Sequence, residues 1–533
     1  MSSLGLAWYN YLALFVAIYF AKWFFDPLRS IPTVGGSSLP LLSYFAAIRW
    51  IRHGKDILQE GYNKACIYYH GSVFKVAMLD QWLVVICGPK LVEDVRKRPD
   101  EELSFHEAAA EFIQIKYTVG HEAHHDPYHI DIVREKLTRN LPAVLPEIMD
   151  ELTVAMHEYI PAKDDEWLCV NVMTATREIV ARASNRVFVG LPACRNREYL
   201  DLAIGFTADV TRDRTTINMF PSFMKPFIGR IVGNSTKNIR RAIPILKPMM
   251  DERRRMMEEF GEEWPDKPND LIQWIMDEGL SRNYSDKDMV QRVLLVNFAA
   301  IHTSSNSITH AIYHLAERPE YLTSLREEIE PIVQEEGWTK AAMARMWKLD
   351  SFMRESQRLN GINTVSLMRK AGKDIVLNDG TFIPRGTLMV TAAHSLHHDD
   401  SVYTDPDVFD PWRFSRQRER EGEAMKHQFV NTSVDYVPFG HGKHACNSLH
   451  DLYAMLSPGR FFAANELKAM LGYIVLNFDV KLEGDGKRPE NVHRGPTVVP
   501  SPSARVFFRK RPASESWYLA LSNVVSFILL QAP

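Results

Sequence analysis

Apolar and polar positions follow two periods along the chain, and the helical period dominates. After about the first 36 residues, most segments repeat apolar side chains every three to four positions, as helices with one buried face do. Alternating stretches are short and few: 73–78 with 82–86, and 374–376 with 381–383 around a turn at Asp379-Gly380. The pattern predicts a mainly α fold with a small β-sheet portion.

The clearest helix begins after Ser285, whose hydroxyl can cap the first turn while Asp288 reaches back, and it stops before Pro319. It spans roughly 50 Å. Its first half, 293–301, is almost continuously apolar, so this helix must cross a domain interior. Residues 303–307 follow with hydroxyl and amide side chains that compete for backbone hydrogen bonds. We therefore expect a loosened turn, and a functional site, midway along a buried helix.

An apolar segment at the N-terminus, Leu6 to Phe25, is interrupted only by Asn10 and Lys22. It is long enough to cross a hydrocarbon core of roughly 30 Å. Basic residues follow it but do not precede it, which places the rest of the chain in the cytosol. A basic leading region and an Ala-x-Ala-like cleavage site are both missing, so we favour an uncleaved anchor over a signal peptide.

These patterns divide the chain into four parts. Residues 1–25 are the predicted single-pass transmembrane anchor, and the prolines and glycines of 26–36 predict a short stiff linker. Residues 37–511 show no repeat or second linker and are expected to form one catalytic domain. Residues 512–533 form a tail whose apolar stretch, Trp517 to Leu530, is too short to span a bilayer comfortably, and we interpret it as an accessory tail or a gene-model extension.

Composition narrows the class of protein. The 63 basic and 66 acidic residues nearly cancel, with a net charge of −3, so no overall field attracts nucleic acid. The five cysteines are an odd and irregularly spaced set, which is typical of a reducing compartment and not of a disulfide framework. We therefore expect no nucleic-acid partner.

A glycine-rich loop near the C-terminus carries the first candidate chemistry: Phe439-Gly440-His441-Gly442-Lys443-His444-Ala445-Cys446. Glycines let a backbone turn tightly, and a thiolate needs backbone N–H groups and a following helix dipole to stabilise its charge. Bound haem requires such a loop, with a cation for a propionate. Cys446 is the candidate iron ligand, and Phe439, Gly440 and His444 are candidate cofactor contacts. A structural cysteine is the simpler alternative.

This string resembles the Phe-x-x-Gly-x-His-x-Cys signature of the cytochromes P450, and the resemblance covers nearly the whole chain. It implies the cytochrome P450 fold with heme b bound through Cys446. Glu355 and Arg358, with Arg413 in Pro-Trp-Arg-Phe, are similar to the family's Glu-x-x-Arg and Pro-x-Arg-Phe elements and imply a structural role beneath the haem. An ordinary helical ion pair is the alternative for the first two.

Two further arginines resemble positions that pair with haem propionates. Arg369 follows Ser-Leu-Met, and Arg134 lies on a helix expected from Tyr128 to Leu141, similar to the family's haem-side C helix. On charge alone, a solvated side chain is the alternative for Arg369.

The long central helix contains Ala299-Ala300-Ile301-His302-Thr303, similar to the family's small-small-x-acid-Thr pattern beside the oxygen site. The resemblance implies catalytic roles for Thr303 and for the proton-carrying neighbour. Here His302 replaces the acid, as in fungal enzymes similar to kaurene oxidases. The alternative is that His302 is a hydrogen-bonded core residue.

The resemblance also implies a reaction and its partners. A monooxygenase of this kind takes electrons from NADPH through a separate cytochrome P450 reductase and inserts one atom of O₂ into a lipophilic substrate, here a terpenoid or steroid of secondary metabolism. It implies a protein of the endoplasmic reticulum membrane with its catalytic domain in the cytosol. An apolar loop at Met219–Phe227 could dip into that membrane.

Two features oppose this interpretation. His121-Glu122-Ala123-His124-His125 matches the His-Glu-x-x-His pattern of zinc hydrolases through His121, Glu122 and His125, although the predicted helix has little more than one turn. Residues 447–457 interrupt the family's pattern between Cys446 and Pro458-Gly459-Arg460, and they separate the sulfur from the helix that should stabilise it. We interpret these eleven residues as an intron-derived insertion; as written, they predict impaired haem binding.

Overall fold

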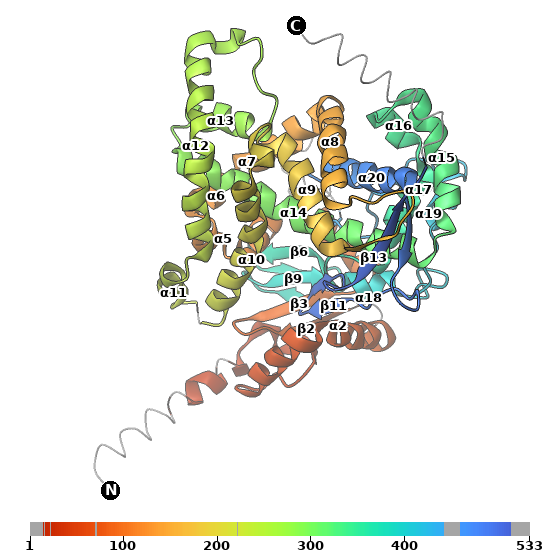
Figure 1. The fold of residues 1–533 in the computed structure, drawn as a ribbon. Helices are drawn as coiled ribbons and strands as arrows, with labels where there is room; N and C mark the ends of the chain where they lie inside the picture. Colours follow the sequence, from red (N-terminus) through yellow and green to blue (C-terminus); the bar gives the residue numbers. More distant parts are fainter. Residues whose placement is uncertain are drawn as a thin grey trace.

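The computed structural model describes residues 14, 16–21, 23–69, 72–220, 222–441 and 459–512. Over these ranges the chain is mainly helical with small sheets, as predicted, and most helices lie on one side of the largest sheet (Figure 1). The helices that build this layer and its edges are α3 (Pro89–Lys97), α4 (Phe105–Ile113), α5 (Ile115–Thr118), α6 (His121–His125), α7 (Tyr128–Ile132), α8 (Thr138–Tyr159), α9 (Val172–Phe188), α10 (Arg197–Asn218), α11 (Lys225–Ile231), α12 (Asn234–Phe260), α13 (Leu271–Ser281), α14 (Asp286–Glu317), α15 (Tyr321–Glu336), α16 (Lys340–Arg345), α17 (Trp347–Leu359), α18 (Ala393–His397), α19 (Arg413–Arg418) and α20 (Arg460–Asn477).

The largest sheet has six strands in the order β1-β2-β3-β9-β6-β4. Helix α2 (Leu42–Tyr69) packs on β2, at the end of the molecule away from most helices (Figure 1). The predicted pair 73–78 and 82–86 forms β2 and β3, which are antiparallel. The strands are β1 (Thr33–Val34), β2 (Val73–Ala77), β3 (Trp82–Ile86), β4 (Leu103–Ser104), β6 (Ser366–Ala371) and β9 (Leu388–Thr391).

Three smaller sheets complete the strands. The predicted turn at Asp379-Gly380 joins β7 (Ile375–Val376) to β8 (Phe382–Ile383). A three-stranded sheet has the order β10-β13-β5, and a hairpin pairs β11 with β12. Their bounds are β5 (Leu168–Asn171), β10 (Phe478–Leu482), β11 (Val492–Arg494), β12 (Thr497–Val499) and β13 (Arg505–Lys510).

The segment 26–36, expected to be a linker, is packed against the domain. Its strand β1 pairs in parallel with β2. Leu28, Ile31 and Val34 are buried in the apolar cluster that also contains the sheet. Apolar side chains at three of these positions find a core to bury in, so this segment is held in place and does not swivel freely.

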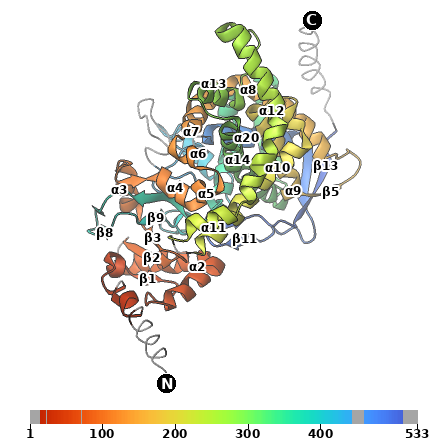
Figure 2. The ribbon, with the colours of Figure 1, turned by 90° about the vertical axis from the view of Figure 1, so that its left-hand side faces the viewer.

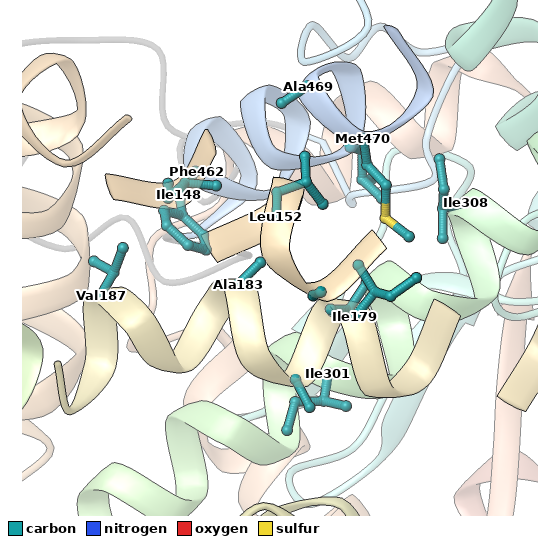
Figure 3. Packing of buried hydrophobic residues seen from close by; sticks show 14 of the residues in the cluster. Ile148, Leu152, Ile179, Ala183, Val187, Ile301, Ile308, Phe462, Ala469 and Met470 are labelled. Carbon is teal, nitrogen blue, oxygen red and sulfur yellow. The ribbon is translucent and has the colours of Figure 1, made fainter. Parts of the chain in front are cut away.

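The central helix α14 crosses the largest apolar cluster, together with α8, α9 and α20 (Figure 3). Ile179 and Ala183 of α9 lie between Leu152 of α8 and Ile301 of α14 in this view. In the turned view, α10 and α12 lie over α14 (Figure 2). Ser285 accepts a hydrogen bond from the Asp288 N–H, and α14 ends at Glu317, as predicted from the sequence.

The helix expected from Tyr128 to Leu141 extends further than predicted. The chain continues through α7, a π-helical turn η2 (Val133–Leu137) and α8 as far as Tyr159. Pro142 lies inside α8 without ending it. A proline removes one helical hydrogen bond, but burial of Leu141, Val144 and Leu145 holds both sides of it against the core.

Candidate functional site

The middle of α14 is partly uncovered, and we call the uncovered part of the helix at Ala299 and Thr303 the opening. Ala299 is exposed and Thr303 is half-buried, whereas the stretches 293–297 and 304–316 of the same helix are buried. Both side chains are one turn apart and therefore face the same way. The Thr303 hydroxyl donates to the Ala299 carbonyl at 2.6 Å, with Ala300 O at 3.1 Å. The resemblance to the oxygen-site pattern thus falls where this helix is uncovered.

The loosened turn predicted at 303–307 is not present, because α14 is helical throughout these residues. Ser307 donates to the Thr303 carbonyl at 3.0 Å, and Thr309 donates to the Ser305 carbonyl at 2.6 Å. Hydroxyls that donate back to carbonyls four positions earlier satisfy themselves without displacing the backbone bonds. The surrounding core then keeps the helix intact.

His302 points away from the Thr303 opening. Its Nε2 lies 2.9 Å from the Ile204 carbonyl of α10, which can only accept, so this nitrogen carries the proton. Burial lowers the pKa of His302, which favours the neutral imidazole. These contacts are those of a hydrogen-bonded core histidine.

Arg369 presents an incompletely bonded charge inside the protein. Its side chain is buried on β6, where the pairing with β9 shifts register between Ser366 and Arg369 and Leu367 has a φ of 50°. Such bulges redirect side chains. Its Nη1 donates to the Met368 carbonyl at 2.8 Å, but Nε and Nη2 have no hydrogen-bond partner among the residues that the structure describes. Donors left unpaired at this depth fit an anionic group from outside the chain.

A nearby carboxyl does not complete Arg369. Burial raises the pKa of Asp100 to about 6, against the opposing effect of the Arg369 charge. Burial likewise lowers the pKa of Arg369 to about 10. The guanidinium therefore still carries its charge near neutral pH, and two of its donors remain available to a propionate.

Arg134 lies on η2, with little of its side chain exposed. Its Nη2 donates to Asp131 at 2.6 Å. Part of this guanidinium is therefore already matched by a carboxylate, in contrast to Arg369.

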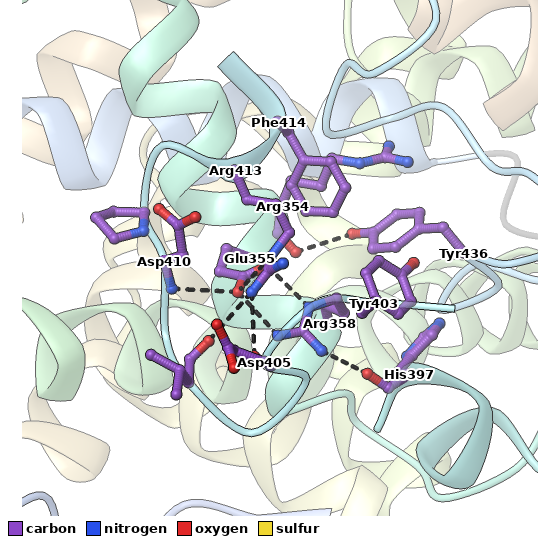
Figure 4. A network of polar contacts seen from close by, with 12 residues as sticks. Arg354, Glu355, Arg358, His397, Tyr403, Asp405, Asp410, Arg413, Phe414 and Tyr436 are labelled. Carbon is purple, nitrogen blue, oxygen red and sulfur yellow. Dashed lines mark hydrogen bonds and ion pairs between the residues drawn. The ribbon is translucent and has the colours of Figure 1, made fainter. Parts of the chain in front are cut away.

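Glu355, Arg358 and Arg413 form a closed network (Figure 4). Arg358 donates two bonds of 2.8 Å to the Glu355 carboxylate, and neither side chain is exposed. Arg413 Nε donates to the same carboxylate at 3.1 Å, and its Nη1 donates to the Thr404 carbonyl at 2.7 Å. The structure therefore differs from the ordinary helical ion pair that was the alternative, because the pair is buried and its remaining donors have partners.

Two residues that were not identified from the sequence connect this network to the glycine-rich loop. The backbone carbonyl of His397 accepts a hydrogen bond from Arg358. The Nε2 atom of the His397 ring accepts one from the Val437 N–H at 3.1 Å. Ser366 donates to the Val437 carbonyl and accepts the Gly440 N–H at 3.2 Å. No local pattern marks either residue; the position of Ser366 three residues before Arg369 is the only signal.

The start of the glycine-rich loop has the expected geometry. Phe439 packs edge-on to Phe429 at 5.7 Å, and Gly440 has a φ of 75°, which glycine adopts without strain. His444 and Cys446, and the interruption at 447–457, lie outside the described residues, as does the tail from 513. Beyond the interruption, α20 begins at Arg460, directly after Gly459.

The zinc-hydrolase interpretation is not supported. The helix carrying His121, Glu122 and His125 is only five residues long. The His121 and His125 rings stack at 5.9 Å on the exposed side of α6, and no metal-ligand group within the described residues includes either of them.

A cavity of about 380 Å³ lies near the C-terminal end of α14, lined by residues that include His314, Arg488 and His493. His314 is three turns along the helix from Thr303. This cavity is therefore separate from the opening beside Ala299.

Comparison with known proteins decides the family. A sequence model of the cytochrome P450 family matches residues 37–508. The chain belongs to the cytochrome P450 family. Members hold a haem whose iron is ligated by a cysteine thiolate, and the unpaired donors of Arg369 and the opening beside Thr303 fit such a group.

Several relatives of this P450 are fungal proteins named as cytochrome P450 monooxygenases. Cytochrome P450 monooxygenase 151 of Postia placenta is 49% identical over 513 residues, covering 96% of this chain and 100% of that protein. An ent-kaurene oxidase of Gibberella intermedia is 30% identical and covers 90% of this chain and 88% of that protein. The retinoic acid-bound cyanobacterial CYP120A1 shares the fold, with a TM-score of 0.65 at 17% identity, covering 90% of this chain and all of that one.

Proposed function

We propose that this P450 monooxygenase oxidises a lipophilic substrate of the terpenoid or steroid class, with electrons from NADPH delivered by a separate reductase. The observation that carries the site is the buried Arg369 with two unpaired donors, near the start of the cysteine loop through Ser366 and Gly440. The substrate class is supported by the relative named as an ent-kaurene oxidase.

Cys446 is the proposed iron ligand, and Arg369, Arg134 and His444 are the proposed partners of the haem propionates. Phe439 and Gly440 are proposed to form the cofactor side of the loop. When bound, the thiolate-ligated haem supplies the activation of O₂ and the transfer of one oxygen atom to substrate. The protein supplies binding, orientation and charge: a buried arginine neutralises a propionate, and the Glu355 network holds the loop entrance through His397 and Val437.

Thr303 is proposed to hold a proton-donating hydroxyl at the opening beside Ala299. Its Oγ1 is bonded to its own helix in the structure, and rotation about its side chain would release it toward the opening. For His302 we propose a lesser role, because its protonated nitrogen already donates to Ile204. It acts on proton supply only if the ring turns away from that carbonyl.

Membrane attachment is a further proposal, supported by residues 6–25 of the sequence. None of the helices in the described part of the chain is both long and apolar enough for a membrane span. The predicted apolar loop is nevertheless uncovered: Met219, Phe223 and Phe227 are 65%, 82% and 64% exposed. We propose that this loop contacts the endoplasmic reticulum membrane and that the catalytic domain faces the cytosol.

Residues 447–457 are proposed to be absent from the functional protein. Their removal would join Cys446 directly to Pro458-Gly459 and to α20, whose N-terminus would then stabilise the thiolate. Sequencing of the mature transcript tests this. If these codons are translated and the full-length protein binds thiolate-ligated haem normally, the proposal is wrong.

The carbon monoxide difference spectrum of the reduced protein tests the site. We expect the strongly red-shifted Soret band of a thiolate-ligated haem, and Cys446→Ser should abolish it. Cys169→Ser is the matched control, because Cys169 lies on β5 of the small sheet. A band that survives Cys446→Ser would exclude the proposed ligand. Product analysis of the protein expressed with a reductase then identifies the substrate class.

A further inference from the structure

Three metal-ligating side chains meet where α4 approaches α6. His106 and Glu107 lie in the first turn of α4, and His124 lies in α6. One potential ligand atom of each residue lies within 4.8 Å of the other two. The imidazole rings of His106 and His124 are nearly parallel, with centroids 4.8 Å apart, and His124 Nε2 is 3.7 Å from a Glu107 oxygen. Within the described ranges, no other group of this kind is found.

The hydrogen bonding of His106 leaves one of its nitrogens ready for a metal. His106 Nε2 lies 3.0 Å from the His124 carbonyl, and a carbonyl can only accept, so Nε2 carries the proton. The Nδ1 lone pair is then free. Metal-binding histidines commonly donate their other N–H to a backbone carbonyl in this way, which fixes the tautomer and the ring.

His124 is also suited to ligation. Its Nε2 lies 3.7 Å from the Glu107 carboxylate. Its Nδ1 is buried and has no hydrogen-bond partner among the residues that the structure describes.

We propose that His106, Glu107 and His124 bind a divalent transition-metal ion of the zinc class. Two imidazoles and one carboxylate form a donor set that zinc accepts, with a fourth position open to water. Calcium and magnesium prefer sites rich in oxygen and are not expected to compete. The Glu107 side chain is 53% exposed, so it can close the remaining distance at little cost.

This site differs from the one that the His-Glu-x-x-His pattern indicates. That pattern would use His121 and His125, whereas the structure places His124, on another side of the short helix, against α4. The proposed ion would join α4 to α6. The two sites share no ligand, so substitutions can separate them.

Zinc binding to the haem-containing full-length protein tests the proposal. Equilibrium dialysis against buffered Zn²⁺, with metal counting, should show one zinc more per chain in the unmodified protein than in His106→Gln or Glu107→Gln, and an at least roughly tenfold weaker affinity in each variant. His121→Gln and His125→Gln are the matched controls and should bind as the unmodified protein does. An excess of Ca²⁺ should not displace the zinc.

Two outcomes would overturn the proposal: equal zinc binding by the unmodified protein and by both α4 variants, or loss of the ion in His121→Gln or His125→Gln. Far-ultraviolet circular dichroism reports whether each variant is folded, independently of its haem content. Glu107→Gln keeps the test decisive even if His106→Gln does not fold, because the Glu107 side chain is exposed and its backbone N–H, not its carboxylate, is capped by Ser104.

Discussion

The surroundings of Glu355 and of Arg369 both bury charge, but only one of them is complete. At Glu355, two arginines satisfy the carboxylate, and carbonyl groups accept their further donors. At Arg369, one nitrogen is bonded to the backbone, and two have no partner in the described part of the chain. Contacts within the chain complete the first arrangement, whereas the second can still accept an anionic group.

The difference distinguishes residues that stabilise the fold from residues proposed to hold the cofactor. Removing one partner of a fully paired buried charge is strongly destabilising, because the other charge stays buried without compensation. A buried charge without its partners costs stability until an external group supplies them. Substitution of Arg358 should therefore lower the stability of the haem-free protein. Substitution of Arg369 should weaken haem binding without lowering the stability of the haem-free protein.

Removing Arg358 should have the largest effect. Arg358→Ala leaves the Glu355 carboxylate buried with only part of its compensation, and we expect a loss of about 3–5 kcal/mol of unfolding free energy. Urea unfolding followed by circular dichroism measures it. Arg255→Ala, at an exposed helical ion pair, is the control and should leave the free energy of unfolding nearly unchanged. Similar losses in both variants would show that burial of the Glu355–Arg358 pair does not increase the cost of removing one partner.

Glu466 is an intermediate case, a buried carboxyl for which the described part of the chain offers no cationic partner. Burial raises its pKa to about 7 from the usual 4.5, while the Ser184 hydroxyl donates to it at 2.6 Å. The folded state favours the protonated form, so the stability contribution is fully present below about pH 4.5 and is lost as pH rises through about 7. The full effect is on the order of 3 kcal/mol.

Glu466→Gln should therefore flatten the fall in stability between about pH 4.5 and 7, the pKa values of the unperturbed and the buried carboxyl. Thermal unfolding across that range measures the change. An unchanged pH profile would show that Glu466 does not titrate differently on folding.

Arg369→Gln should affect haem retention and leave the fold intact. Loss of a charge-assisted contact to a propionate costs roughly 1.5–3 kcal/mol, or about tenfold to a hundredfold in haem affinity. Haem transfer to an acceptor protein measures this, with the exposed Arg385→Gln as the charge-matched control. The haem-free variant should be as stable as the haem-free parent or more so. A less stable haem-free variant would place Arg369 with the Glu355 network.

Thr303→Ala should have the smallest effect on stability, below about 1 kcal/mol, because the hydroxyl bonds only to its own helix. Its effect should appear in coupling: more NADPH consumed and more peroxide released for each product formed. The comparison of peroxide and product yields measures this, with Ser307→Ala, one turn along α14, as the control. Unchanged coupling in Thr303→Ala would separate this opening from the oxygen site.

The family and most of the helices and strands follow from the sequence alone, because they depend on patterns of neighbouring residues. The cap at Ser285, the stop before Pro319 and the hairpin turn at Asp379-Gly380 are each decided by residues a few positions apart. The prediction that the helix from Tyr128 ends at Leu141 was wrong, because the contacts that hold α8 together around Pro142 come from distant helices.

The partners of individual side chains become visible only in the tertiary structure. His302 hydrogen-bonds to the Ile204 carbonyl, 98 positions away. The His124 ring stacks on His106 of α4, and neither contact can be predicted from the local sequence. Arg369 and Arg358 are both buried arginines, yet Arg358 also donates to the His397 carbonyl of another element, whereas two nitrogens of Arg369 have no partner among the described residues. Periodicity specifies which face of an element is buried, whereas hydrogen bonds and charge pairs depend on which elements that face meets.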